Sequence, residues 1–133
     1  MKLFLDDVRM PQECTRYVKA YGINPDVYLD QWMIVRTYKD FVSFIETNGI
    51  PDVVSFDHDL AEVHYDPKTW KEGFEYTEET GLDCAKWLVR YCEKQGKPFP
   101  KWYCHSMNPV GRENINKLLY GVRDNREIRG NGL

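Results

Sequence analysis

Short apolar runs alternate with longer amphipathic stretches along the chain. Four runs have the length and composition of buried parallel strands: Lys2 to Leu5, Trp32 to Val35, Pro51 to Phe56 and Trp102 to Cys104. Strands that alternate with helices are typical of a parallel sheet with right-handed crossovers. We therefore expect an α/β fold with at least four parallel strands in the order 2-1-3-4 and helices on both faces.

Helix signals fall between the predicted strands. Thr37 to Asp40 fits a capping box, and the helix it opens ends at Asn48-Gly49. Thr80 to Asp83 opens a second helix, which presents one apolar face and ends at Gly96. Asn108-Pro109 opens a third, because Asn is a favoured N-cap and Pro a favoured first helical residue.

Three segments lack a clean period. Between the first two strands, Cys14 to Tyr21 is a candidate helix closed by Gly22. Residues 61–79 are polar, aromatic and acidic, which predicts a long loop insertion that covers a site. Residues 124–133 are rich in charge, Gly and Asn, so we expect a loose tail. The whole chain, 1–133, has the length of a single domain.

Composition narrows the class of protein. The chain is 42% hydrophobic and carries a net charge of −3, which allows one core and offers no basic stripe for extended duplex nucleic acid. A single-stranded end held in a small pocket is compatible with that charge. No apolar run is long enough to span a membrane, and acids interrupt the N-terminus before a signal-peptide core could form. The pattern favours a cytoplasmic protein and leaves its oligomeric state open.

The cysteines agree with that compartment. They are Cys14, Cys84, Cys92 and Cys104. None of them forms a Cys-x-x-Cys pair, so we expect four free thiols in a reducing environment and no zinc site built from them.

Polar clusters follow three of the four predicted strands. They are Asp6-Asp7, Asp57-His58-Asp59 and His105-Ser106. In open parallel sheets, sites form at the carboxyl ends of strands, where the strand order reverses. These clusters therefore predict one site on that edge of the sheet.

The acids of this site predict a divalent metal. Asp6, Asp7 and Asp57 would repel one another if they converged without a cation. Oxygen ligands favour Mg²⁺, Mn²⁺ or Ca²⁺, and we expect Mg²⁺ or Mn²⁺, with Asp59 as a further candidate ligand. The alternative is that Asp6 or Asp7 caps the next turn and Asp59 caps a loop.

The remaining polar residues suggest phosphate chemistry. His58 and His105 could act as general acid and base, could complete a transition-metal site, or could be hydrogen-bonded structural residues. Arg9 could bind a phosphate in a forked geometry or form a salt bridge to one of the acids. Ser106 and Asn108 could donate to a phosphate where the last helix opens, although Asn108 is also explained as an N-cap.

These residues together resemble the receiver domains of two-component signalling. The matching stretches are Leu3 to Asp7, Pro51 to Asp57 and Thr80 to Asp83, which look like the first strand with its acid pair, the strand of the phosphoacceptor aspartate and the helix that follows. The chain departs from an ordinary receiver in two ways. Its loop after Asp57 is longer, and we find neither the fifth strand nor the catalytic lysine that ends that strand in a receiver.

A divergent group, the cyclic-phosphate processing receiver domain, resembles the chain more closely. Its marks correspond here to Asp6-Asp7-Val8-Arg9, Asp57-His58-Asp59 and His105 with nearby Asn108, over roughly residues 1 to 120. The resemblance implies a receiver-like, flavodoxin-like sandwich of three layers and a role in handling cyclic phosphate ends on RNA.

We therefore expect a metal-dependent phosphoesterase that acts on 2′,3′-cyclic RNA ends or small cyclic nucleotides. In that reading His105 moves the proton, with His58 as second candidate, and Asp57 is either a metal ligand or a nucleophile that carries an aspartyl phosphate. Arg9, Ser106 and Asn108 steady the phosphate. Two alternatives stay open: a signalling module phosphorylated on Asp57, and a protein that binds a cyclic nucleotide without cleaving it.

Overall fold

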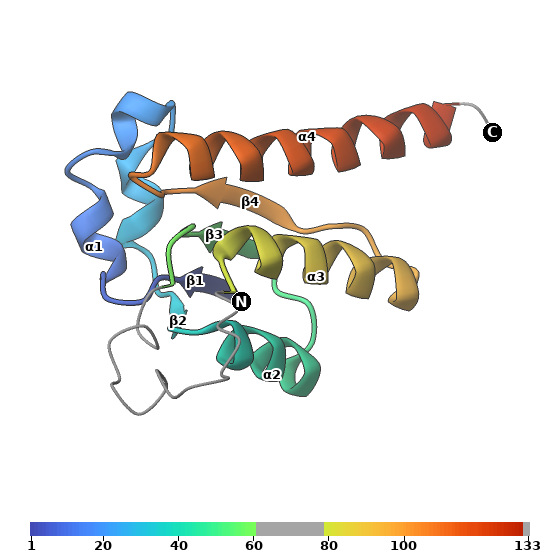
Figure 1. Cartoon of the computed structure of the whole chain (residues 1–133), viewed down its shortest axis with the longest axis horizontal. Helices are drawn as coiled ribbons and strands as arrows, with labels where there is room; N and C mark the ends of the chain where they lie inside the picture. Colours follow the sequence, from blue (N-terminus) through green and yellow to red (C-terminus); the bar gives the residue numbers. More distant parts are fainter. Residues whose placement is uncertain (61–78, 132–133) are drawn as a thin grey trace, which may run out of the picture.

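The sheet has four parallel strands. In a computed structural model, which describes residues 1–60 and 79–131, they are β1 (Lys2–Leu5), β2 (Met33–Val35), β3 (Val53–Phe56) and β4 (Lys101–Cys104). Their order is β2-β1-β3-β4, and every pairing is parallel (Figure 1). The receiver-like α/β fold and the strand order predicted from the sequence are confirmed.

Three long helices share one core with one face of the sheet. They are α2 (Tyr38–Asn48), α3 (Gly81–Gln95) and α4 (Pro109–Asn131). Side chains alternate across a strand, so Leu3, Leu5, Val54 and Phe56 point to this face. They pack there with apolar residues of all three helices. This burial fixes the strand register from which the site is built.

Short helices cover the opposite face. They are α1 (Pro11–Cys14) and the 3₁₀ helices η1 (Val18–Tyr21) and η2 (Pro25–Leu29), and their core is built around Phe4, Val18 and Tyr28. The single helix predicted over Cys14 to Tyr21 is wrong. Tyr17 leaves the helical region with φ −136°, and its hydroxyl donates to the carbonyl of His105 at 2.9 Å. Gly22 closes η1 in the left-handed region with φ 79°, as predicted.

The predicted helix starts are confirmed. Thr80 and Asp83 form a complete capping box, whereas Thr37 only accepts the N–H of Asp40, at 3.1 Å. Asn108 accepts the N–H of Gly111 at 3.0 Å and so caps α4. All four cysteines are free and buried.

The end of the chain corrects one prediction. Helix α4 continues to Asn131, where the sequence suggested a loose tail over 124–133. The stretch contains Arg and Glu, which favour helices, and no proline to end one. Because α4 follows β4 directly, no fifth strand occurs in the described part of the chain. None of the described helices is long and apolar enough to cross a membrane. The predicted loop over 61–79 lies, except for Glu79, outside the described residues.

Candidate metal centre

Three strands bring the central residues of the site together. The backbone ladder continues one step beyond the strands: the N–H of Asp57 donates to the carbonyl of Leu5 at 2.9 Å, and that of His105 to the carbonyl of Phe56 at 3.0 Å. Asp6, Asp57 and His105 therefore lie side by side at the carboxyl ends of β1, β3 and β4. The sequence predicted this edge of the sheet as the location of the site.

Asp6, Asp57 and His105 form a group that could hold a metal ion. Each offers one ligand atom, and these atoms all lie within 4.8 Å of one another. Asp6 and His105 are fully buried, and Asp57 is 4% exposed. Two of the four predicted carboxylates belong to the group, and an imidazole joins them. Asp59 lies outside it, with a side chain that is 57% exposed.

Asp6 combines two of the roles that the sequence left open. Its Oδ1 accepts the backbone N–H groups of Val8 at 2.9 Å and Arg9 at 2.7 Å, so it caps the turn after β1. Its Oδ2 lies 3.0 Å from Nε2 of His105 and 3.5 Å from Nη1 of Arg9. Burial acts to raise the pKa of Asp6, but the hydrogen bonds from His105 and the two N–H groups outweigh it and hold the pKa well below its usual range. Asp6 is therefore ionised at neutral pH.

Asp57 has the opposite electrostatic character. Burial and then the charge of Asp6 raise its pKa to about 7, although the carboxylate accepts the N–H of His58 at 2.8 Å. At neutral pH the folded protein therefore holds a proton on Asp57 for part of the time. A divalent cation placed between the two carboxylates would offset the charge of Asp6, which adds to the effect of burial in keeping this proton bound.

His105 is held in one orientation by a buried chain of hydrogen bonds. Its ring stacks on Phe4 with 4.4 Å between centroids. Its Nδ1 lies 2.7 Å from Oγ of Ser55, and that Oγ lies 2.7 Å from the hydroxyl of Tyr28. Burial lowers the pKa of His105 despite the nearby Asp6, so the ring is neutral. The chain from Tyr28 through Ser55 keeps Nε2 directed at Asp6.

A second polar group forms the rim of the site. Nδ1 of His58 lies 2.9 Å from Oδ1 of Asp59, and the amide of Asn108 donates to both oxygens of Asp59 at 3.3 and 3.4 Å. Asn108 also caps α4, so the rim is tied to the start of that helix. Unlike His105, the side chain of His58 is 16% exposed.

Arg9 and Ser106 lie between the centre and the surface. The guanidinium of Arg9 faces Asp6 and donates to Sδ of Met107 at 3.2 Å, and its side chain is 28% exposed. The salt bridge considered for Arg9 is therefore present, at a length beyond an ordinary hydrogen bond. Ser106 is buried, and its hydroxyl accepts the backbone N–H of Asn108 at 3.1 Å.

Sequence reasoning missed several supporting residues. Arg36 donates from Nη1 to the carbonyl oxygens of Asp6 at 3.1 Å and Arg9 at 2.7 Å, which fastens the turn between them. A Cβ on Gly111 would lie 2.3 Å from Cγ of His58, so only glycine leaves room for that imidazole. A glycine in the first turn of a helix is a signal that could have been read, because glycine is unfavourable there. Arg36 carries no such signal.

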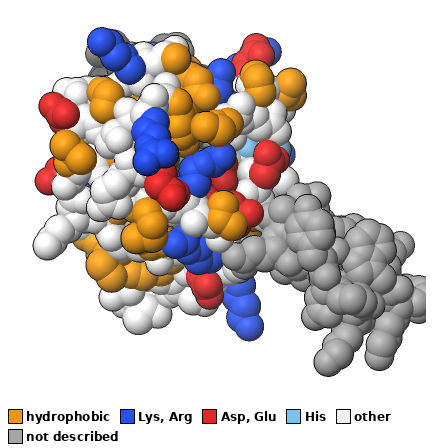
Figure 2. Space-filling model, turned by 90° about the vertical axis from the view of Figure 1, so that its left-hand side faces the viewer, with side chains coloured by type: hydrophobic (Ala, Val, Ile, Leu, Met, Phe, Trp, Pro, Cys, Tyr) orange, Lys and Arg blue, Asp and Glu red, His pale blue; other side chains and the backbone are white. Residues whose placement is uncertain are grey.

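The site lies at the carboxyl ends of the strands, on the side of the molecule toward which the strands point. Figure 2 shows that side, where basic, acidic and hydrophobic side chains are intermixed. Hydrophobic residues that follow β1 and β4 are exposed there: Val8 is 70% exposed, Met107 49% and Val110 68%. The face is therefore neither strongly basic nor strongly acidic.

Comparison with protein families now adds to this geometry. The family described as the cyclic-phosphate processing receiver domain matches residues 1–121. The chain belongs to this family. The match runs from β1 into α4 and includes the residues of the candidate centre and its rim. Comparisons with curated proteins and with solved structures give no match. The resemblance to the cyclic-phosphate processing receiver domain, which was inferred from the sequence motifs, is therefore confirmed.

Proposed function

We propose that this receiver domain is a metal-dependent phosphoesterase that opens cyclic phosphates, either at a 2′,3′-cyclic RNA end or in a small cyclic nucleotide. The observation that carries the proposal is the buried group of Asp6, Asp57 and His105, whose ligand atoms lie within 4.8 Å of one another in a family named for cyclic-phosphate processing.

The residues present fit a divalent ion. Two carboxylates supply negative charge, and the raised pKa of Asp57 marks a position where a second negative charge lacks compensation. Ser55 contacts the ring nitrogen of His105 that faces away from the centre, an arrangement common for metal-bound histidines. Mg²⁺ and Mn²⁺ both suit carboxylates, and the imidazole favours Mn²⁺ because Mg²⁺ prefers oxygen ligands. A bound ion would neutralise phosphoryl charge and activate water.

Burial separates the roles of the two histidines. His105 is fully buried with both ring nitrogens engaged, which suits a metal ligand or a positioning residue. His58 lies at the rim, where Asp59 orients its Nδ1 and proton transfer would use Nε2. We therefore assign proton transfer to His58 and metal binding to His105, the reverse of the order expected from the sequence.

Arg9 is the residue proposed to hold the phosphate. Its contact with Asp6 is long, so its guanidinium keeps donors for a forked pair with phosphoryl oxygens. Asn108 acts one step away, because its amide holds Asp59 and Asp59 orients His58. Ser106 holds the backbone at Asn108 and so supports the same rim.

The test is turnover of 2′,3′-cyclic mononucleotides with Mn²⁺ or Mg²⁺, followed by phosphorus NMR. We expect the reaction to yield a phosphomonoester, and we expect a chelator to abolish its formation. His58→Gln should lower the rate by about a hundredfold to ten-thousandfold, the usual cost of removing a general acid or base. Asp52→Asn is the control, since Asp52 is exposed and pairs with the N-terminal amine. No turnover by folded wild type with either metal would refute the proposal. A stable phosphate on Asp57 after treatment with a small phosphodonor would instead identify a signalling receiver.

A further inference from the structure

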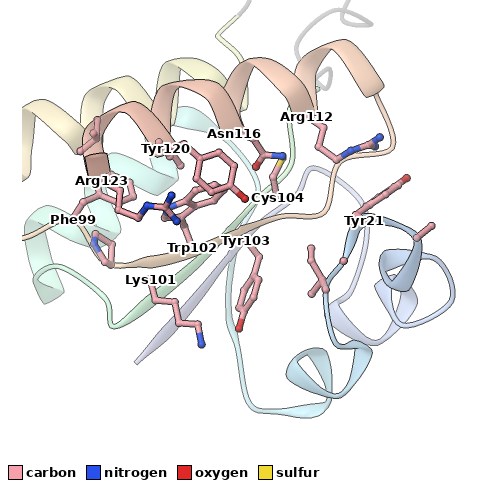
Figure 3. A pocket seen from close by; sticks show the side chains of 16 residues that line it. Tyr21, Phe99, Lys101, Trp102, Tyr103, Cys104, Arg112, Asn116, Tyr120 and Arg123 are labelled. Atoms are coloured by element: carbon pink, nitrogen blue, oxygen red, sulfur yellow. The ribbon is translucent and has the colours of Figure 1, made fainter. Parts of the chain in front are cut away.

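A groove runs along the open edge of the sheet. β4 is an edge strand in the described part of the chain, and a hollow of about 830 Å³ lies beside it (Figure 3). It is lined by residues 20–23, by residues 99–104 and by one face of α4. The volume is in the range of ligand-binding pockets. The hollow therefore lies along the sheet edge that a fifth strand would cover in an ordinary receiver.

Cations and aromatic rings occur in pairs in this groove. The pairs are Lys101 over Tyr103 at 5.5 Å, Arg112 over Tyr21 at 3.7 Å and Arg123 over Tyr120 at 4.8 Å, measured to the ring centroid. Trp102 adds a ring that meets Tyr120 edge-on at 5.0 Å. Among the described residues that line the groove, none is Asp or Glu. The groove is thus locally cationic and aromatic on a chain whose net charge is −3.

One end of the groove adjoins the candidate metal centre. Arg112 lines the groove and donates from Nη1 to the carbonyl of Ser106 at 2.9 Å. Cys104 also lines it and is followed directly by His105. Figure 3 shows Arg112 at this end and Lys101 at the other, so the groove follows β4 away from the centre.

We propose, building on the phosphoesterase function above, that this groove binds the single-stranded RNA chain whose cyclic end enters the metal centre. Nucleobases stack on aromatic rings and on stacked guanidinium groups without regard to sequence, and phosphates pair with the cations between them. A peptide strand added to β4 would gain its affinity mainly from backbone hydrogen bonds, which do not require three cations paired with rings. The substrate class is then RNA ends, with small cyclic nucleotides as minimal substrates.

The test measures binding by fluorescence anisotropy, with a labelled single-stranded RNA that ends in a 3′-phosphate and cannot be turned over. Three phosphate contacts predict a slope of about −2 in the logarithm of affinity against the logarithm of salt concentration. Replacing both Lys101 and Arg123 with Gln should reduce the slope to about −0.7 and weaken binding at least tenfold. Tyr120→Ala should weaken it by about fivefold to a hundredfold. Lys117→Gln, an exposed position of α4 outside the groove, is the matched control and should bind like wild type.

The outcomes separate this inference from the proposed function. Groove variants should turn over a cyclic mononucleotide at the wild-type rate, since none of these side chains contacts the centre. RNA binding that is absent, or equal in the groove variants and wild type, overturns the inference even when mononucleotide turnover is normal. The wild type could instead form dimers that are lost in the groove variants and are unaffected by RNA. That result would overturn the inference, because a second copy of the chain would then occupy β4. RNA binding that depends on the groove residues, without turnover of any cyclic phosphate, would support RNA binding by the groove and refute the proposed phosphoesterase activity.

Discussion

Replacing Asp57 with Asn should stabilise the metal-free protein, and the gain should grow with pH. Burial and the charge of Asp6 raise the pKa of Asp57 from 3.8 to about 7. Between these values the folded protein holds a proton that the unfolded chain has released, so the free energy of unfolding falls as pH rises. The cost approaches about 4 kcal/mol above neutral pH, and about 2 to 3 kcal/mol of it accrues between about pH 5 and pH 8. The Asn side chain keeps an oxygen that can accept the N–H of His58, and it removes the carboxyl group that titrates.

Two neighbouring groups bear on the same measurement. The pKa of His105 is lowered by burial, so its contribution to stability rises with pH up to about its ordinary value of 6.5 and opposes that of Asp57. The pKa of Asp6 is lowered, so its contribution changes only in acid, below the window used. The difference between variant and wild type therefore isolates Asp57 better than the wild-type curve alone.

The assay is urea unfolding followed by tryptophan fluorescence at several pH values in the presence of a chelator. We expect the stability advantage of the variant over wild type to grow by about 2 to 3 kcal/mol from about pH 5 to about pH 8. Adding Mn²⁺ should narrow this difference, because an ion at a hundred times its Kd stabilises the wild type by about 2.7 kcal/mol. Asp59→Asn, at an exposed carboxylate, should show no such trend. Parallel curves for Asp57→Asn and wild type would refute the assigned electrostatics.

Other substitutions test the supporting residues. His105→Gln should remove the preference for Mn²⁺ over Mg²⁺ in calorimetry, and an unchanged preference would exclude His105 as a ligand. Gly111→Ala should cost about 1–3 kcal/mol in thermal unfolding and lower turnover, because the methyl group would clash with the imidazole of His58. Gly121 lies on the same helix, where an added Cβ would have no packing neighbour within 4 Å. Gly121→Ala should instead stabilise the protein by up to about 1 kcal/mol. Ser55→Ala should cost about 1–3 kcal/mol, because it leaves buried polar partners unsatisfied.

The sheet and the central acids were predictable because their signals are local. Each strand is a short run rich in apolar residues, and Asp6, Asp57 and His105 directly follow three of the four strands. In a parallel sheet this places the three clusters on one edge, and the register places them at one level. The family resemblance rests on the same residues, which is why the motifs and the family match agree.

The second layer of the site was not predictable, because it depends on contacts between distant segments. Tyr28 lies in the short 3₁₀ helix η2, a stretch with no sequence motif for a site, and only the folded chain brings its hydroxyl to Ser55. Ser55 itself reads as one polar residue within an apolar strand. The burial that distinguishes His105 from His58 also arises from packing, through the stacking of His105 on Phe4. The local sequence around two histidines at strand ends does not predict which of them will be buried.

Helix α4 connects the two sites proposed for this protein. Its first residues hold the rim: Asn108 binds Asp59, and Gly111 makes room for His58. Its next turns line the groove beside β4, beginning with Arg112, which also binds the carbonyl of Ser106. In the described chain this helix follows β4 directly, so the sheet edge that a fifth strand would cover is left beside the helix. The same feature that separates this chain from an ordinary receiver thus creates a surface leading to the centre, which a phosphoacceptor module would not require and an RNA-end phosphoesterase would use.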